Sequence, residues 1–155
     1  VCSSDLLVSG YAIKDINIAV RQLRYVAETA DLDYINEIDN PSEKLKRFEL
    51  YWKKLDPSPG TERNEAFDEY YARIDFVNKN FKTYSDGWLS DRGAVYIVYG
   101  PPYNVDRYSN YGDGRVAERW TYSSGRQFVF VDNTGFGDYR LVQPMSITDK
   151  YKYNR

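Results

Sequence analysis

Three aspartates, Asp91, Asp132 and Asp138, each lie near the end of a predicted β-strand, where carboxylates could do chemistry. Two carboxylates across a cleft can serve as the acid and base of a glycosidase, and a group of carboxylates can hold a divalent cation. The pattern therefore keeps open a carboxylate-dependent hydrolase of glycosidase or metal-dependent type. Their spacing matches no cation-binding loop of the EF-hand kind, however, and aspartate beside glycine commonly forms turns. The alternative is that all three are structural.

The residues that usually lead catalysis are absent or doubtful. The sequence has no histidine, the most frequent general base and metal ligand near neutral pH. Its one cysteine, Cys2, lies in the stretch VCSSDL (residues 1–6), which resembles the translation of a sequencing adapter. We expect residues 1–6 to be an extraneous scar and exclude them from the fold. No authentic thiol then remains, and we predict no catalytic residue, no metal and no cofactor.

Composition limits the class of partner. The chain has 155 residues, 42% hydrophobic and 28% charged, as in an ordinary globular domain. Its net charge of −2 argues against a nucleic-acid partner, which needs clustered lysine and arginine. No apolar run approaches the ~20 residues of a transmembrane helix. The most unusual feature is the sixteen tyrosines, whose apolar rings and polar hydroxyls suit contact surfaces.

A tyrosine-rich segment between two predicted strands is the candidate binding site. It reads PPYNVDRYSNYGDGR, and its three tyrosines are Tyr103, Tyr108 and Tyr111. Loops of this length are more often functional or disordered than purely connecting, and the segment could also be merely mobile. Trp and Tyr dominate protein interfaces and also stack on sugars, so the partner could be a protein or a polysaccharide.

The elements that must position these residues are helices first and strands afterwards. Apolar residues at three- and four-residue steps predict helices over residues 12–30, 41–55 and 62–81. Asn40 and Thr61 are the expected caps of the second and third. Alternation with period two then predicts strands over residues 94–99, 117–122, 126–132 and 138–143. Short connections indicate an antiparallel meander, so the predicted fold is α+β, with N-terminal helices packed on a small, about four-stranded antiparallel sheet.

The stretch DGWLSDRGAVYIVYGPP (residues 86–102) is predicted to be a structural corner. Gly87 suits a turn with positive φ or a close backbone approach. Trp88 would fill the corner, and Ser90 would accept from backbone amides, as would Asp91. Arg92 can pair with a carboxylate. After this stretch, Gly100 and Pro101 would end the strand, because consecutive prolines cannot donate to a ladder.

Several separated motifs make the sequence similar to the bacterial GWxTD domain family. They occur in the same order as in that family, and the family's name has threonine where this chain has Ser90; either hydroxyl can brace a turn. The residues that carry the resemblance are Trp52 in YWKKLDPSPG, Gly87, Trp88, Ser90, Asp91, Arg92 and Gly93 at the corner, Gly100 and Pro101 after it, Trp120 in ERWTY, and Gly135, Gly137 and Asp138 in NTGFGDY.

The resemblance spans roughly residues 32–142 and gives the predicted organisation. A helical segment over 7–31 precedes a GWxTD-like domain over 32–143, and a polar tail over 144–155 follows and is expected to fray. The resemblance implies a bacterial protein, often exported, hence periplasmic or associated with the outer membrane, and it implies no established reaction. We therefore expect a non-enzymatic, extracytoplasmic interaction or scaffolding module.

Overall fold

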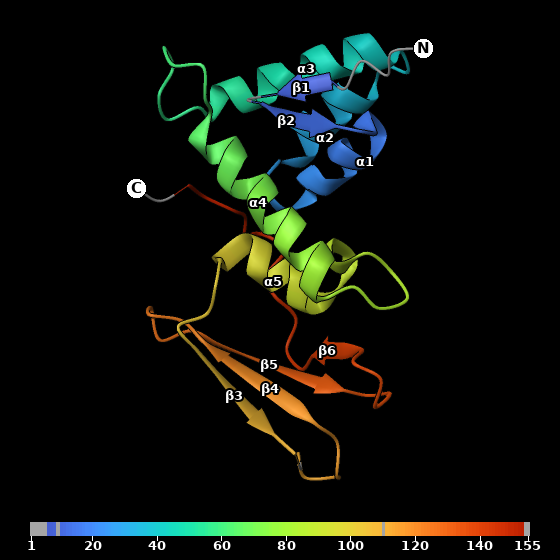
Figure 1. Cartoon of the computed structure of the whole chain (residues 1–155), viewed down its shortest axis with the longest axis vertical. Coiled ribbons are helices and arrows are strands. Elements are labelled where there is room, and N and C mark those ends of the chain that lie inside the picture. The colour runs from blue at the N-terminus through green and yellow to red at the C-terminus, as the bar shows by residue number, and fades with distance from the viewer. Residues whose placement is uncertain (1–5, 9, 110, 154–155) are drawn as a thin grey trace. The chain divides into compact units, whose positions relative to one another are not determined.

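A computed structural model describes residues 6–8, 10–109 and 111–153, and shows helices in the first half and a sheet in the second (Figure 1). The elements, in chain order, are β1 (Leu6–Val8), β2 (Tyr11–Ile13), α1 (Ile16–Gln22), the 3-10 helix η1 (Leu23–Tyr25), α2 (Thr29–Asn36), α3 (Pro41–Lys54), α4 (Glu65–Asn80), the 3-10 helix η2 (Gly87–Leu89), α5 (Asp91–Tyr99), β3 (Asn104–Tyr108), β4 (Ala117–Thr121), β5 (Gln127–Asp132) and β6 (Tyr139–Leu141). The predicted α+β class with a four-stranded antiparallel sheet is confirmed.

The chain divides into two compact units. Unit 1 comprises residues 1–72 and 152–155, and unit 2 comprises residues 73–151. The boundary falls inside α4, so the first half of this helix belongs to unit 1 and the second half to unit 2.

The single helix predicted over residues 12–30 is wrong. Residues 11–13 form β2, which pairs with β1 in a two-stranded antiparallel sheet. Asp15 then caps α1, since its carboxylate accepts from the N–H groups of Asn17 and Ile18. A 3-10 turn at Leu23–Tyr25 ends this helix before α2 begins. Residues 1–5 of the expected scar lie outside the described residues, and Leu6 belongs to β1.

The prediction for α3 is confirmed and that for the cap of α4 is wrong. The Asn40 side chain accepts from the N–H groups of Ser42 and Glu43, and Pro41 occupies the first turn, where its missing N–H costs nothing. In α4 the cap is Asn64, not Thr61, because the Asn64 side chain accepts from the Phe67 N–H at 3.0 Å.

Unit 1 is built around a buried aromatic cluster. Its rings meet mostly edge to face, with Trp52 and Phe67 at a centroid distance of 5.2 Å and an angle of 90°. The hydroxyl of Tyr70 donates to the Gln22 carbonyl oxygen, and that of Tyr71 donates to the Ala19 carbonyl oxygen. The buried members of the cluster include Phe48, Tyr51, Trp52, Phe67, Tyr70 and Tyr71.

Unit 2 contains the sheet, whose strand order is β3-β4-β5-β6 with antiparallel neighbours throughout. The helix-facing side packs Trp120, Phe128 and Phe130 against Val95 of α5. Because side chains alternate along a strand, Arg119 and Val129 project from the opposite side, which we call the open face. A tight turn containing Gly125, at φ 81°, joins β4 to β5.

The strand predicted over residues 94–99 is wrong, since AVYIVY lies in helix α5. A six-residue apolar run has no period that separates a strand from a buried helix. Helical start and stop signals flank it: the Ser90 side chain accepts from the Gly93 N–H, and Gly100 ends the helix at φ 80°. The fourth strand is instead β3, an edge strand with little apolar alternation.

Within the predicted tail, residues 145–151 are tied down rather than frayed, contrary to the prediction. Met145 packs against the hydrophobic cluster of the sheet, and the Asp149 carboxylate pairs with Arg126 at 3.1 Å. Tyr151 is buried, with the guanidinium of Arg73 5.0 Å from its ring centre. None of the helices in the described part of the chain has the length and apolar character that crossing a bilayer requires.

Candidate functional site

Gly87 is required by a close backbone approach. A Cβ atom at this position would lie 1.8 Å from the carbonyl oxygen of Val77 and 2.9 Å from the Cα atom of Asn78, so η2 packs directly on the end of α4. Of the two alternatives predicted for this glycine, close approach applies, and positive φ does not. The Asn78 side chain also accepts from the N–H of Trp88, whose ring is buried.

Ser90 joins the two sides of the corner. Its hydroxyl donates to the Gly87 carbonyl oxygen at 2.7 Å and accepts from the Gly93 N–H at 3.0 Å, which makes it the cap of α5. Gly93 is also confined, because a Cβ atom there would lie 1.9 Å from the Gly87 oxygen. A threonine hydroxyl at position 90 could make the same two bonds.

Asp91 ties the corner to the sheet. Its carboxylate accepts from the backbone N–H of Leu141 in β6 at 2.8 Å, across 50 residues of sequence. This bond fixes the first turn of α5 against the last strand. The carboxylate thus has a structural partner of the kind expected for a brace.

Arg92 lies in a buried charge cluster that the sequence analysis did not find. Its guanidinium lies 4.1 Å from the ring centre of Tyr139 and 4.7 Å from that of Phe81. It faces the carboxylate of Glu118 at 3.5 Å, and Glu118 is only 3% exposed. The Trp120 indole N–H donates to the same carboxylate at 3.1 Å.

Arg107 completes the partners of Glu118, with its Nε 3.1 Å from the second carboxylate oxygen. The register of the sheet brings these residues together, because Arg107 pairs with Glu118 across β3 and β4. The signal in the sequence is Glu118 itself, an acidic residue at an inward-facing position of the strand AERWT.

The two other aspartates serve turns as well. The Asp132 carboxylate accepts from the N–H groups of Thr134, Gly135 and Gly137, between 2.8 and 3.1 Å. Burial opposes ionisation of this carboxyl, but the three amides outweigh it and lower its pKa. Asp138 pairs with Arg140 at 3.1 Å. Gly135 and Gly137 have φ of 74° and 89°, which glycine adopts without strain.

The hydrolase candidates therefore all have structural partners. Asp91 binds a strand amide, Asp132 binds a loop, and Asp138 binds an arginine. In the described ranges of the chain, no three His, Cys, Asp or Glu side chains are grouped so that they could hold a metal ion.

Gly100 and Pro101 end helix α5 rather than a strand. Gly100 has φ 80°, and a Cβ atom there would lie 3.0 Å from the guanidinium of Arg73. Its carbonyl oxygen accepts from the buried Tyr122 hydroxyl at 2.9 Å. Pro101 is exposed and leads into the short connection to β3.

The three candidate tyrosines do not share a long loop. Tyr103 precedes β3 and is 83% exposed, whereas Tyr108 is the last residue of β3. On the open face, the Arg119 guanidinium lies 5.3 Å from the Tyr108 ring centre and pairs with Asp106 at 2.8 Å. Only Tyr111 lies in the β3–β4 connection, where its N–H donates to the Arg115 carbonyl oxygen.

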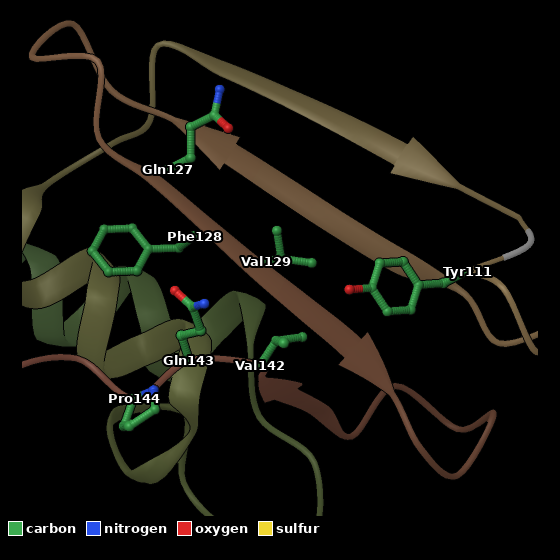
Figure 2. Close-up of a pocket in the computed structure, with 7 residues that line it drawn as sticks. All are labelled: Tyr111, Gln127, Phe128, Val129, Val142, Gln143 and Pro144. Atoms are coloured by element: carbon green, nitrogen blue, oxygen red, sulfur yellow. The ribbon is translucent and has the colours of Figure 1, made fainter.

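Tyr111 borders a hollow in unit 2. This cleft has a volume of about 340 Å³ and lies along β5 where the chain leaves β6 (Figure 2). Figure 2 shows the Tyr111 hydroxyl directed toward Val129 and Val142. We call this hollow the β5 cleft; it is lined by Tyr111, Gln127, Phe128, Val129, Val142, Gln143 and Pro144.

A second hollow, of about 250 Å³, lies between α2 and α3 of unit 1. Charged pairs crowd it: Lys54 meets Asp31 at 2.7 Å, and the Arg47 guanidinium lies 4.2 Å from the ring centre of Tyr34. Its basic and acidic groups already satisfy one another, so it offers less to a ligand than the β5 cleft.

The three tryptophans are divided between the two units. Trp52 belongs to the aromatic cluster of unit 1. Trp88 fills the corner and Trp120 lies in the sheet cluster, both in unit 2. All three are at most 3% exposed.

Comparison with known proteins gives one match. The family model of the GWxTD domain matches residues 11–153, which extends beyond the predicted range of 32–143 on both sides. No curated protein and no solved structure matches the chain. The motif that names the family coincides with the corner built by Gly87, Trp88, Ser90 and Asp91. The chain belongs to the GWxTD domain family.

Proposed function

We propose that this GWxTD domain is a non-enzymatic interaction module whose contact surface is the open face of the unit 2 sheet around the β5 cleft. One observation carries the proposal: the polar residues of the family motif are occupied in bracing the corner, while Tyr111 at the β5 cleft of the same unit remains accessible. Asp91 holds a strand amide, whereas Tyr111, which lines the β5 cleft, is 39% exposed. Exposed aromatic side chains around a hollow are typical of binding surfaces.

The open face also supplies polar groups that can orient a partner. Arg119 and Asp106 form a partly exposed pair there, at 2.8 Å, with Tyr108 beside them. Gln127 lies at the rim of the cleft with an exposed side chain. Such a mixture of aromatic rings, amides and one ion pair can bind a protein or a polysaccharide.

Location outside the cytoplasm is part of the proposal and rests on the family resemblance alone. In a host that carries the gene, fractionation of cells should recover the protein with periplasmic or outer-membrane markers. Recovery with cytoplasmic markers would contradict this part without affecting the contact surface.

Site-specific photocrosslinking tests the contact surface. A photoreactive phenylalanine analogue placed at Tyr111 should yield a discrete adduct in the native host, identified by mass spectrometry as a protein or a glycan. The matched control is the same analogue at Tyr84, which is 87% exposed and does not line the cleft. Equal labelling from both positions, or none from Tyr111, would contradict the proposal.

The hydrolase alternative has its own test. Purified protein incubated with cell-wall polysaccharides and peptides should show no turnover. Turnover that is lost in Asp91→Asn while the variant keeps its circular dichroism spectrum would make the domain an enzyme and overturn the proposal.

A further inference from the structure

β5 extends beyond the strand that pairs with it. The pairing of β6 with β5 ends where Leu141 lies opposite Phe130. The last backbone bond between the two segments runs from the Val142 N–H to the Val129 carbonyl oxygen, at 2.9 Å. β5 itself begins at Gln127, so its first residues have no strand beside them on this side.

Backbone hydrogen bonds fix the direction in which β5 presents its polar groups. The Tyr122 N–H donates to the Arg126 carbonyl oxygen, so even-numbered residues of β5 face β4, and odd-numbered residues face the cleft. The N–H and C=O of Gln127 and the N–H of Val129 therefore point into the β5 cleft. Within the described ranges of the chain, no hydrogen bond is made to these three groups.

Pro144 explains why β6 does not cover this edge. The β5–β6 register places residue 144 opposite Gln127, and a proline has no N–H to donate to the Gln127 carbonyl oxygen. Beyond it, Met145 packs into the hydrophobic cluster on the helix side of the sheet, and Asp149 pairs with Arg126. The chain is thus anchored away from the edge, and the gap is a fixed feature of unit 2.

The walls of the cleft combine apolar side chains with two side-chain amides. Tyr111, Val129 and Val142 approach one another along one side, and Val142 is 48% exposed (Figure 2). Gln127 and Gln143 contribute amides nearby. A volume of about 340 Å³ lies within the range of ligand sites, which begins at roughly 300 Å³.

From this geometry we infer that the β5 cleft binds a short extended segment of a protein partner, which adds as a strand to the free edge of β5. The inference rests on the proposed function and names its partner class. Main-chain donors and acceptors of alternate residues recur every ~6.8 Å along a strand, and an extended polypeptide carries the complementary groups at the same spacing. A polysaccharide has no such fixed alternation.

The added segment has predictable features. It lacks proline at the residue that pairs with Gln127, since that residue must donate an N–H. It carries a β-branched or aromatic side chain directed toward Tyr111 and Val142, where apolar surface is exposed. The neighbouring side chains along the segment point the opposite way.

The inference is tested by mRNA display, in which a random heptapeptide library is selected for binding to the full chain. Enriched peptides are then synthesised with single N-methyl groups. Methylation of amides that face β5 should weaken binding at least tenfold, and methylation of the alternate amides should leave it unchanged. Binding should also slow hydrogen exchange at the N–H groups of Gln127 and Val129.

Two variants locate the site. Val142→Lys places a charge in the apolar wall and should weaken peptide binding at least tenfold. Ile147→Lys is the control, because Ile147 is 91% exposed and does not line the cleft. Both positions are on the surface, and circular dichroism verifies that each variant is folded.

The other outcomes overturn the inference. No enrichment of peptides, or bound peptides that leave the exchange of Gln127 and Val129 unchanged, would exclude strand addition. Protection of the same amides by soluble cell-wall oligosaccharides would assign the cleft to a sugar and leave the proposed function intact. Hydrogen exchange at Gln127 and Val129 could also slow as the protein concentration is raised, with no peptide added. If the chain then also dimerises in analytical ultracentrifugation, the edge of β5 binds a second copy of this chain.

Discussion

Units 1 and 2 each bury an aromatic cluster, but they join it to polar groups differently. In unit 1 the hydroxyls of Tyr70 and Tyr71 donate to backbone carbonyl oxygens of the N-terminal helices. In unit 2 the Trp120 indole donates to the buried carboxylate of Glu118, which also faces Arg92. Unit 1 is held mainly by helices that pack by their apolar faces, whereas unit 2 depends on a corner, a buried charge and an interrupted sheet edge.

This contrast assigns different roles to the two units. The β5 cleft, where unpaired backbone groups lie beside an exposed tyrosine, is in unit 2, and so is the motif that names the family. The corner gives the helix and the sheet of unit 2 a fixed geometry through two confined glycines and three side-chain bonds. A rigid scaffold of this kind is what a preformed binding edge requires.

The largest expected effect concerns the corner. Gly87→Ala should cost more than about 5 kcal/mol of unfolding free energy, because its Cβ atom would lie 1.8 Å from a backbone oxygen that cannot move aside. Thermal and denaturant unfolding measure the loss. The control is Gly112→Ala, at φ 67° with no atom within 4 Å, which should cost about 1 kcal/mol. Equal losses would show that the close approach does not matter.

The second largest expected loss of stability concerns the aromatic cluster of unit 1. Trp52→Ala should cost about 3–5 kcal/mol, because the ring is 1% exposed and touches four other aromatic rings of that cluster. Leu50→Ala, on the same helix but 56% exposed, should change stability by less than about 0.5 kcal/mol. A small loss in Trp52→Ala would mean that unit 1 does not depend on its aromatic packing.

The third largest expected loss of stability concerns the buried carboxylate of Glu118 in unit 2. Glu118→Ala should cost about 3 kcal/mol, since it leaves the guanidinium of Arg92, whose side chain is only 14% exposed, without its carboxylate. The value is at the low end for buried pairs because Arg107 remains hydrated, with its side chain 76% exposed. Denaturant unfolding measures it, and Arg107→Ala, which removes only the exposed partner, should cost about 1 kcal/mol or less. If Glu118→Ala leaves the free energy of unfolding unchanged, the buried charge does not stabilise unit 2, and the two units differ in packing alone.

The parts of the fold that local signals specify were predictable from the sequence. Helix α3 has a capping asparagine and a first-turn proline, and β5 is a short run of aromatic and β-branched residues with a glycine in the turn on each side. The corner residues were recognised as structural from their turn-forming types. These signals act within a few residues of one another, so sequence alone reveals them.

The rest depends on contacts that are distant in the sequence. The run AVYIVY was ambiguous between helix and strand, and its flanking cap at Ser90 decided for helix. β3 was missed because an edge strand exposes most of its side chains. The Glu118 charge cluster and the β5 cleft arise from strand register, which brings Arg107 to Glu118 and leaves Gln127 opposite a proline.

A smaller effect concerns the serine that replaces the family's threonine. Ser90→Ala removes both bonds of the cap and should cost about 1 kcal/mol. Ser90→Thr keeps the hydroxyl and should stay within about 0.5 kcal/mol of the native chain. Unfolding of the two variants side by side checks this. If Ser90→Ala has the same free energy of unfolding as the native chain, the hydroxyl of Ser90 does not stabilise the corner.

The smallest effect is a pH dependence in the last turn of unit 2. Although burial opposes its ionisation, the Asp132 carboxyl has a pKa below its ordinary value of 3.8, because three loop amides donate to the charged form. Its contribution to stability is therefore present above pH 3.8 and is lost as the pH falls through the lower pKa of the folded state. In Asp132→Asn the side chain no longer titrates, so the variant should be less stable than the native chain at pH 7. The difference between their melting temperatures should shrink as the pH is lowered below about 4. A difference that stays constant from pH 7 to pH 2 would show that the charge of Asp132 does not hold the turn.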